Sequence, residues 1–112
     1  MDGALIFNTS LRYAHLRHTS LRGAILGQVD LTGADLGRAC LQSAVLAGVV
    51  LSEATLARST FSRARISHVD LTSCVDLTRV QLLTANLEDN VVVPMDWPPL
   101  QRLPVTRKKD MG

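Results

Sequence analysis

The feature that most constrains this chain is a strict five-residue repeat of apolar side chains. Fourteen successive positions of that repeat carry an aliphatic or aromatic residue, namely Ile6, Leu11, Leu16, Leu21, Leu26, Leu31, Leu36, Leu41, Leu46, Leu51, Leu56, Phe61, Ile66 and Leu71. The residue two places before each one is small or β-branched: Ala4, Thr9, Ala14, Thr19, Ala24, Val29, Ala34, Ala39, Ala44, Val49, Ala54, Ser59, Ala64 and Val69. A period held this strictly indicates an architecture in which successive units stack on one another.

Neither regular secondary structure accommodates a five-residue period while it stays straight. On an α-helix, five residues rotate the chain by about 500°, so successive leucines lie roughly 140° apart and form no apolar stripe. On a straight strand, an odd spacing places successive leucines on opposite faces. The chain must therefore turn a corner in every repeat, and each repeat then points its leucine and its small residue at a shared axis.

A second period predicts how many corners complete one turn. Identical small residues recur 20 positions apart in two columns, which are Ala4, Ala24, Ala44 and Ala64, and Val29, Val49 and Val69. Four repeats per turn is the simplest arrangement that stacks these residues on each other. The sequence therefore predicts an all-β fold, a right-handed quadrilateral parallel β-helix of about four coils that follow one another at about 4.8 Å.

Several repeats share a further pattern around the central leucine. The segments Gly33-Ala34-Asp35-Leu36-Gly37, Val29-Asp30-Leu31-Thr32 and Ala85-Asn86-Leu87 follow the order A-(D/N)-L-x-x. This order resembles the consensus of the pentapeptide repeat family, and the resemblance extends over residues 4–89. It implies the same right-handed quadrilateral β-helix. Several members of that family are similar to a DNA rod and act on type II topoisomerases, most have no known partner, and the resemblance transfers no catalytic motif.

The two ends of the chain are expected to differ. We predict a β-helix over residues 1–90 and a proline-rich capping segment with a flexible basic tail over residues 91–112. Residues 90–93 predict one last strand, and the prolines that follow exclude a long helix or a paired strand. The apolar residues expected to cover the last coil as a lid are Met95, Trp97, Leu100 and Leu103, and residues 107–110 are expected to fray.

At the other end the repeats begin almost at the first residue, so the first coil would expose an unpaired edge. Leu5 and Phe7 are expected to fold over this edge; the alternatives are that another copy covers it or that the chain was cut from a longer protein.

The repeat also slips by one residue after Leu71, because the next central residues are Leu77, Leu82 and Leu87. The inward small positions that precede them are then expected at Val75, Val80 and Ala85. We expect the extra residue within residues 72–74, as a bulge at a corner that marks either a recognition point or a tolerated insertion.

Composition and charge exclude several classes of function. The formal charge of +2 is too small to demand nucleic acid or a membrane as partner, and no apolar run approaches a membrane-spanning length. The first residues lack the basic start of a signal peptide. Cys40 and Cys74 do not suggest a disulfide framework, so we expect two free thiols and a cytoplasmic protein.

No group of side chains predicts catalysis, a metal or a cofactor. The three histidines do not converge, and no cysteine joins them at a spacing typical of metal ligands. No serine has a neighbouring histidine and acid, and a convex rod offers no cleft for paired carboxylates. The aspartates are expected to serve the backbone at corners or the solubility of the rod. The sequence predicts neither an enzyme nor a small-molecule substrate.

Two outer faces depart from a neutral surface. An apolar face carries Leu5, Ile25 and Val45 in one column, with Phe7 and Ala47 at its margins, and no charge over three coils. Its structural alternatives are that corner geometry turns these side chains partly inward, or that the N-terminal residues fold over them. A basic column carries His18, Arg38, Arg58 and Arg79, spaced by 20 or 21 residues. Its structural alternative is a solvated charged face.

We interpret the chain as a non-enzymatic interaction or scaffold module that presents flat faces to a protein partner or to a second copy of itself. The alternative is a topoisomerase-directed DNA mimic that protects gyrase. That mechanism requires an anionic rod, whereas residues 6–87 contain eight arginines and five acidic residues, a balance of +3. Nucleic-acid binding has the right sign of charge but lacks interleaved aromatic residues for base stacking.

Overall fold

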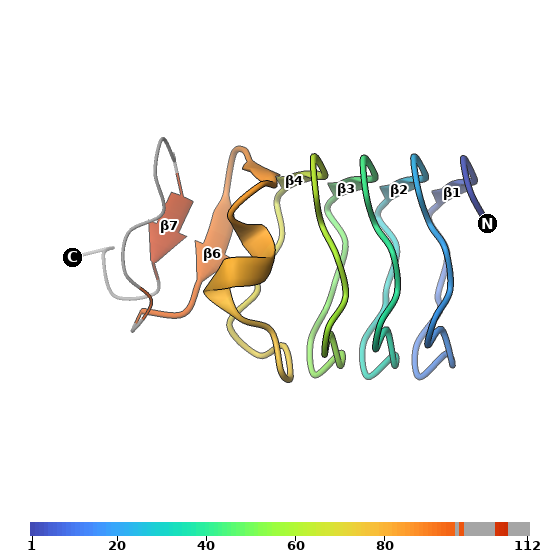
Figure 1. The fold of residues 1–112 in the computed structure, drawn as a ribbon, viewed down its shortest axis with the longest axis horizontal. Helices are drawn as coiled ribbons and strands as arrows, with labels where there is room; N and C mark the ends of the chain where they lie inside the picture. Colours follow the sequence, from blue (N-terminus) through green and yellow to red (C-terminus); the bar gives the residue numbers. More distant parts are fainter. Residues whose placement is uncertain (96, 98–104, 108–112) are drawn as a thin grey trace.

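A computed structural model describes residues 1–95, 97 and 105–107 of the chain (Figure 1). Its strands are β1 (Leu5–Phe7), β2 (Ile25–Gly27), β3 (Val45–Ala47), β4 (Arg65–Ser67), β5 (Asn86–Leu87), β6 (Val91–Val93) and β7 (Val105–Arg107), with one 3-10 helix, η1 (Arg79–Leu82), between β4 and β5. β1 to β5 form one parallel sheet in sequence order, and β6 and β7 form a second.

The register of the first sheet shows one coil every 20 residues. Leu26 of β2 lies between Ile6 of β1 and Leu46 of β3, and Leu46 lies beside Ile66 of β4. The other sides are built from isolated parallel bridges at the same spacing, which join Ser10, Asp30 and Val50, then His15, Asp35 and Thr55, then Ser20, Cys40 and Thr60. Four columns of pairing in 20 residues confirm the four-sided parallel coil, whereas its right-handed sense stays a prediction.

The corners are tight turns that place one residue per repeat in the left-handed region. Hydrogen bonds such as Ala14 N–H to Leu11 O, at 3.1 Å, close these turns. The residue inside the turn has φ near +60° at twelve non-glycine positions, which are Asn8, Tyr13, His18, Gln28, Arg38, Ser43, Glu53, Arg58, Arg63, His68, Asp76 and Asn90. Side chains other than glycine adopt this conformation at a cost, so the stacked core must stabilise it.

The core is the column of leucines predicted from the repeat. Leu26, Leu46 and Ile66 are at most 1% exposed, and the alanines of the neighbouring small positions are equally buried. Leu31, Leu51 and Leu71, on the next side, are each 2% exposed. Both predicted columns are therefore confirmed as core.

The extra residue lies further along the chain than the sequence predicted. Val75 still pairs with Thr55, 20 residues before it, so residues 72–74 contain no insertion. The spacing becomes 21 only when Arg65 pairs with Asn86. The extra residue is therefore taken up between these two points, where η1 leaves the coil. The predicted inward positions 75 and 80 are wrong, because Val75 is 43% and Val80 66% exposed.

The C-terminal end continues the stack. Val92 of β6 pairs with Asp70, and its N–H donates to the Val69 carbonyl at 3.0 Å, which confirms the predicted last strand. Of the four expected lid residues, Trp97 packs against the core, Met95 is 51% exposed, and Leu100 and Leu103 lie outside the described residues. The expectation that the prolines exclude a paired strand is wrong, because β7 follows Pro104 and pairs with β6. Residue 107, expected to fray, belongs to β7, and residues 108–110 lie outside the described part.

Candidate functional site

The outer surface of β1 to β3 carries an apolar strip, defined here as Leu5, Phe7, Ile25, Val45 and Ala47. Leu5 pairs with Ile25, and Ile25 with Val45, so their side chains form one column on the outside of the sheet. Leu5 is 67%, Phe7 53% and Ile25 36% exposed, while Val45 and Ala47 are half-buried. The structure therefore brings the predicted residues together on one face, and corner geometry does not turn Leu5, Phe7 or Ile25 inward.

Phe7 lies along the outer wall and not over the open end of the first coil. Its ring covers Gly27 of the next coil so closely that a Cβ added at Gly27 would come within 2.7 Å of the ring. The expectation that Phe7 covers the unpaired end is therefore wrong. Sequence reasoning missed this contact, although a large residue followed by glycine 20 positions later is a readable signal. Tyr13 and Gly33 repeat the arrangement on the next corner.

Charge ends the strip at β4. None of the nine residues of β1, β2 and β3 is charged. The next residue in the column after Val45 is Arg65, which pairs with Glu88 at 2.9 Å between Nε and Oε2. The apolar strip therefore begins in the first coil, at β1, and ends at β4, where the Arg65–Glu88 ion pair lies.

The predicted basic column is regular for three of its four members. His18, Arg38 and Arg58 occupy equivalent left-handed corner positions and are exposed. The backbone N–H groups of His18 and Arg38 donate to the carbonyls of the next coil, at 2.9 and 2.8 Å. Arg79 lies in η1, outside the regular coil, and its Nε is buried without a hydrogen-bond partner. Because of the one-residue slip in the repeat, Arg79 does not occupy the left-handed corner position that His18, Arg38 and Arg58 share.

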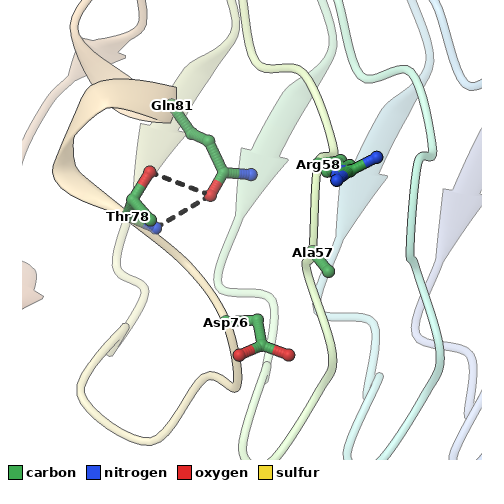
Figure 2. A pocket seen from close by; sticks show the side chains of 5 residues that line it. All are labelled: Ala57, Arg58, Asp76, Thr78 and Gln81. Carbon is green, nitrogen blue, oxygen red and sulfur yellow. Dashed lines mark hydrogen bonds between the residues drawn. The ribbon is translucent and has the colours of Figure 1, made fainter.

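A shallow cavity of about 380 Å³ opens where η1 leaves the coil, lined by Ala57, Arg58, Asp76, Thr78 and Gln81 (Figure 2). The expectation that the rod offers no cleft is wrong at this point. Gln81 uses its polar atoms to hold η1 in place: Oε1 accepts from the Thr78 N–H at 2.8 Å, and Nε2 donates to the carbonyls of Leu56 and Ser59 at 2.9 and 2.8 Å. The hydrogen bonds of Gln81 hold η1 against the coil at the point where the extra residue is taken up. The cavity is therefore a consequence of the one-residue slip in the repeat.

The aspartates on the faces serve the corners, as predicted. Asp30 Oδ1 accepts from the N–H and hydroxyl of Thr32 at 3.0 and 2.5 Å, and Asp70 does the same for Thr72 at 2.8 and 2.5 Å. The hydrogen bonds from Thr32 lower the pKa of Asp30, because they stabilise its charged form. Arg12 adds an ion pair to Asp30 at 3.6 Å.

The cysteines and histidines form no reactive cluster in the described residues. Cys40 and Cys74 are free thiols. Burial of Cys74, with Asp70 nearby, raises the pKa of its thiol to about 12, so the thiolate needed for nucleophilic chemistry is scarce. Across residues 1–95, 97 and 105–107, no three His, Cys, Asp or Glu side chains are grouped so as to hold a metal ion.

Comparison with known proteins identifies the architecture. The family model described as pentapeptide repeats matches residues 1–38 and 39–75, which together are more than half of the chain. The chain belongs to the pentapeptide repeat family. No curated protein matches it in sequence. The resemblance seen in the A-(D/N)-L-x-x segments is therefore confirmed.

A solved pentapeptide repeat protein, Rfr23, shares the fold of this one. Rfr23 from the cyanobacterium Cyanothece 51142 is 23% identical with a TM-score of 0.65; the match covers 98% of this chain and 60% of Rfr23. A pentapeptide repeat protein from the thylakoid lumen of Arabidopsis thaliana is 18% identical with a TM-score of 0.46, and 90% of this chain and 69% of that one are covered. QnrB1, a plasmid-mediated fluoroquinolone resistance protein, is 11% identical with a TM-score of 0.41, over 98% of this chain and 86% of that one.

This pentapeptide repeat protein spans three fifths of the length of Rfr23. Within the described residues, no helix has both the length and the apolar character needed to cross a membrane.

Proposed function

We propose that this pentapeptide repeat protein is a non-enzymatic interaction module that binds a protein partner through the apolar strip on β1 to β3. The observation that supports it is a column of exposed aliphatic side chains, with Leu5 and Ile25 at 67% and 36% exposure, on a face without charge over three coils. Isolated exposed leucines are common on protein surfaces, whereas aliphatic residues in register form a contiguous patch that favours contact.

The rigidity of the sheet supports the same proposal. The strands of the strip are hydrogen-bonded to one another, and β2 and β3 are backed by the core residues Leu26 and Leu46, each 1% exposed. The Phe7 ring is already packed over Gly27. Binding to such a surface orders few side chains, and a low ordering cost leaves more of the buried apolar area to appear as affinity. The partner that fits is a flat or gently concave apolar surface with an uncharged centre.

The chemistry of the polar groups supports a non-enzymatic role. The Asp30 and Asp70 carboxylates hold threonines at corners, Gln81 braces η1, and the raised pKa of Cys74 keeps its thiol protonated. The two carboxylates and the Gln81 amide therefore already have structural tasks in the rod.

The alternative of a gyrase-directed DNA mimic has no specific observation in its favour. A surface that replaces DNA must present regularly spaced negative charge, because the competed site binds phosphates. Here Asp30 and Asp35 lie beside Arg12 and Arg17, at 3.6 and 3.8 Å, and the exposed corner column carries His18, Arg38 and Arg58.

The test compares two double variants with the same change of charge on different faces. Ile25→Lys with Val45→Glu places charges in the strip, whereas Val50→Lys with Val75→Glu places them at positions on other sides that are 44% and 43% exposed. Purified protein of each kind is used to capture partners, and circular dichroism reports whether each is folded. We expect the partner to be retained by the wild type and by the Val50/Val75 variant, and lost by the Ile25/Val45 variant. Equal retention by both folded variants would contradict the proposal.

A further inference from the structure

The ladder of backbone hydrogen bonds is interrupted beside the corner residue Arg58. At the same corner of the two preceding coils, the N–H groups of His18 and Arg38 donate to the coil that follows, to Gly37 O at 2.9 Å and to Ala57 O at 2.8 Å. Arg58 has the same left-handed conformation one coil later, with φ of +59°. Among the residues that the structure describes, its N–H has no hydrogen-bond acceptor.

The acceptor is missing because the chain leaves the regular coil at this place. The ladder is still intact at Leu56 and is restored at Arg63, whose N–H groups both donate to the next coil at 2.9 Å. Between these two points η1 replaces the regular side, and the side-chain Nε2 of Gln81 donates to the Ser59 carbonyl at 2.8 Å. Gln81 therefore satisfies an orphaned backbone acceptor, whereas no described side chain satisfies the orphaned donor of Arg58.

The cavity of about 380 Å³ lies in this gap of the ladder. Figure 2 shows Ala57 and Arg58 on one coil, and Asp76, Thr78 and Gln81 on the segment that leaves the next coil. Because the N–H groups at this corner point toward the following coil, that of Arg58 points toward the cavity. Backbone donors in folded proteins are nearly always paired, so this one is available to an acceptor that a ligand brings.

The charges around the cavity are available as well. Arg58 and Asp76 both line it, yet they form no ion pair with each other or with any other described residue. Arg38, one coil away in the basic column, also has no ion-pair partner in the described part of the chain. A fitting ligand therefore brings an acceptor for the Arg58 N–H, a donor for the Asp76 carboxylate and negative charge for the two guanidinium groups. An extended peptide with acidic side chains brings all three.

We propose that an extended acidic segment of a partner protein binds in this cavity and takes the place of the missing ladder. A main-chain carbonyl of the segment accepts from the Arg58 N–H, a main-chain N–H donates to the Asp76 carboxylate, and acidic side chains pair with the guanidinium groups of Arg58 and Arg38. When a strand is added to an exposed edge, main-chain hydrogen bonds give affinity and side chains give specificity. The site is separate from the apolar strip, which lies on another side of the coil.

Two arginine variants of the full chain test this proposal. Arg58→Gly removes the guanidinium group at the cavity, and Arg63→Gly is the matched control. Both arginines are exposed and lie in left-handed corners, with φ of +59° and +60°, a conformation that glycine adopts freely. The probe is a six-residue peptide of alternating threonine and glutamate with blocked ends, and the same peptide with lysine in place of glutamate is its control. Amide chemical shifts in a nuclear magnetic resonance titration measure binding and its position.

We expect the glutamate peptide to shift the Arg58 amide with a Kd on the order of 1 mM, because exposed ion pairs add little affinity. Arg58→Gly should weaken binding about five-fold and Arg63→Gly less than two-fold. The lysine peptide should not bind. The proposal would be overturned by a glutamate peptide that causes no shift at about 10 mM, by equal binding of the lysine peptide, or by equal losses in the two variants. Inorganic phosphate that reproduces the shifts would indicate a simple anion site and would also overturn it.

Hydrogen exchange on the unmodified chain tests the open donor directly. The Arg58 amide should exchange faster than those of Arg38 and Arg63, which are hydrogen-bonded to the next coil, and the glutamate peptide should slow it. Equal protection of the three amides in the free protein would overturn the proposal. Ile25→Lys with Val45→Glu should leave the affinity for the peptide unchanged, so failure of the apolar strip as a docking site would not affect this one. Loss of peptide binding in that double variant would place the peptide on the strip and contradict the assignment to the cavity.

Discussion

Truncation of Leu46 tests how the stacked core stabilises the coil. Leu46 is 1% exposed and lies in register between Leu26 and Ile66, whose backbones are hydrogen-bonded to its own strand on either side. Leu46→Ala removes three buried carbon atoms, and the cost combines the lost transfer free energy with a term for the cavity that remains. Because the ladder holds neighbouring coils about 4.8 Å apart, the site cannot collapse, and we expect a loss near the upper end of the usual range, about 3–5 kcal/mol.

The matched control is Leu16→Ala, which removes the same atoms from a half-buried position in the open first coil. There the cavity opens to solvent, so the loss should be less than half as large. Urea unfolding followed by circular dichroism, at one fixed protein concentration, gives the free energy of unfolding of each variant. A loss below about 1 kcal/mol for Leu46→Ala, or equal losses for the two variants, would refute the reasoning.

Three further predictions concern corners, thiols and acid. Glu53→Gly should raise the free energy of unfolding by up to about 1 kcal/mol in the same urea assay, because Glu53 has φ of +58° and glycine adopts that conformation without a Cβ clash; a loss of stability would contradict this. Cys40 should react with a thiol reagent at pH 8 far faster than Cys74, whose pKa is raised to about 12. Mass spectrometry after brief labelling measures the extent of reaction at each cysteine, and faster labelling of Cys74 would contradict this prediction. The pKa of Asp30 is lowered below its ordinary value of 3.8, so its stabilising effect is complete above that value and is lost as pH falls through the lower, folded-state pKa. Asp30→Asn should therefore reduce the loss of stability in acid, and an unchanged pH profile of thermal unfolding would rule out this contribution.

The regular part of the fold follows from the sequence because one rule governs every repeat. The five-residue period requires a corner, and the 20-residue recurrence of alanine and valine sets four corners per turn. The buried columns through Leu26 and Leu31 were therefore predictable residue by residue. The apolar strip followed for the same reason, since a residue beside a central leucine must point outward.

The sequence analysis placed the extra residue too early in the chain, because the hydrogen-bond register of the coil decides which side chains point inward even where an apolar residue suits an inward position. Val75 and Val80 suit an inward position, yet the ladder holds Val75 opposite Thr55 and so directs its side chain outward. The local signal for η1 was Thr78 followed three residues later by Gln81, a pattern typical of a helix start. The bonds from Gln81 to the Leu56 and Ser59 carbonyls join distant parts of the chain, and no local pattern predicts them.

The direction in which outer side chains lean also escaped prediction. Phe7 was expected over the open end, but Gly27 leaves room for its ring on the outer wall of the next coil. A contact between residues 20 apart depends on the three-dimensional stack. Sequence spacing places Phe7 and Gly27 in one column without showing which way the ring points.

Site-specific photo-crosslinking tests most directly the claim that the apolar strip binds a partner. A photoreactive residue is placed either at Ile25 in the strip or at Val50 on the next side, two outward positions with 36% and 44% exposure. The account predicts a crosslinked protein partner of one defined mass from position 25 and none from position 50. Crosslinking from position 50 but not from position 25, or equal crosslinking from both, would contradict it.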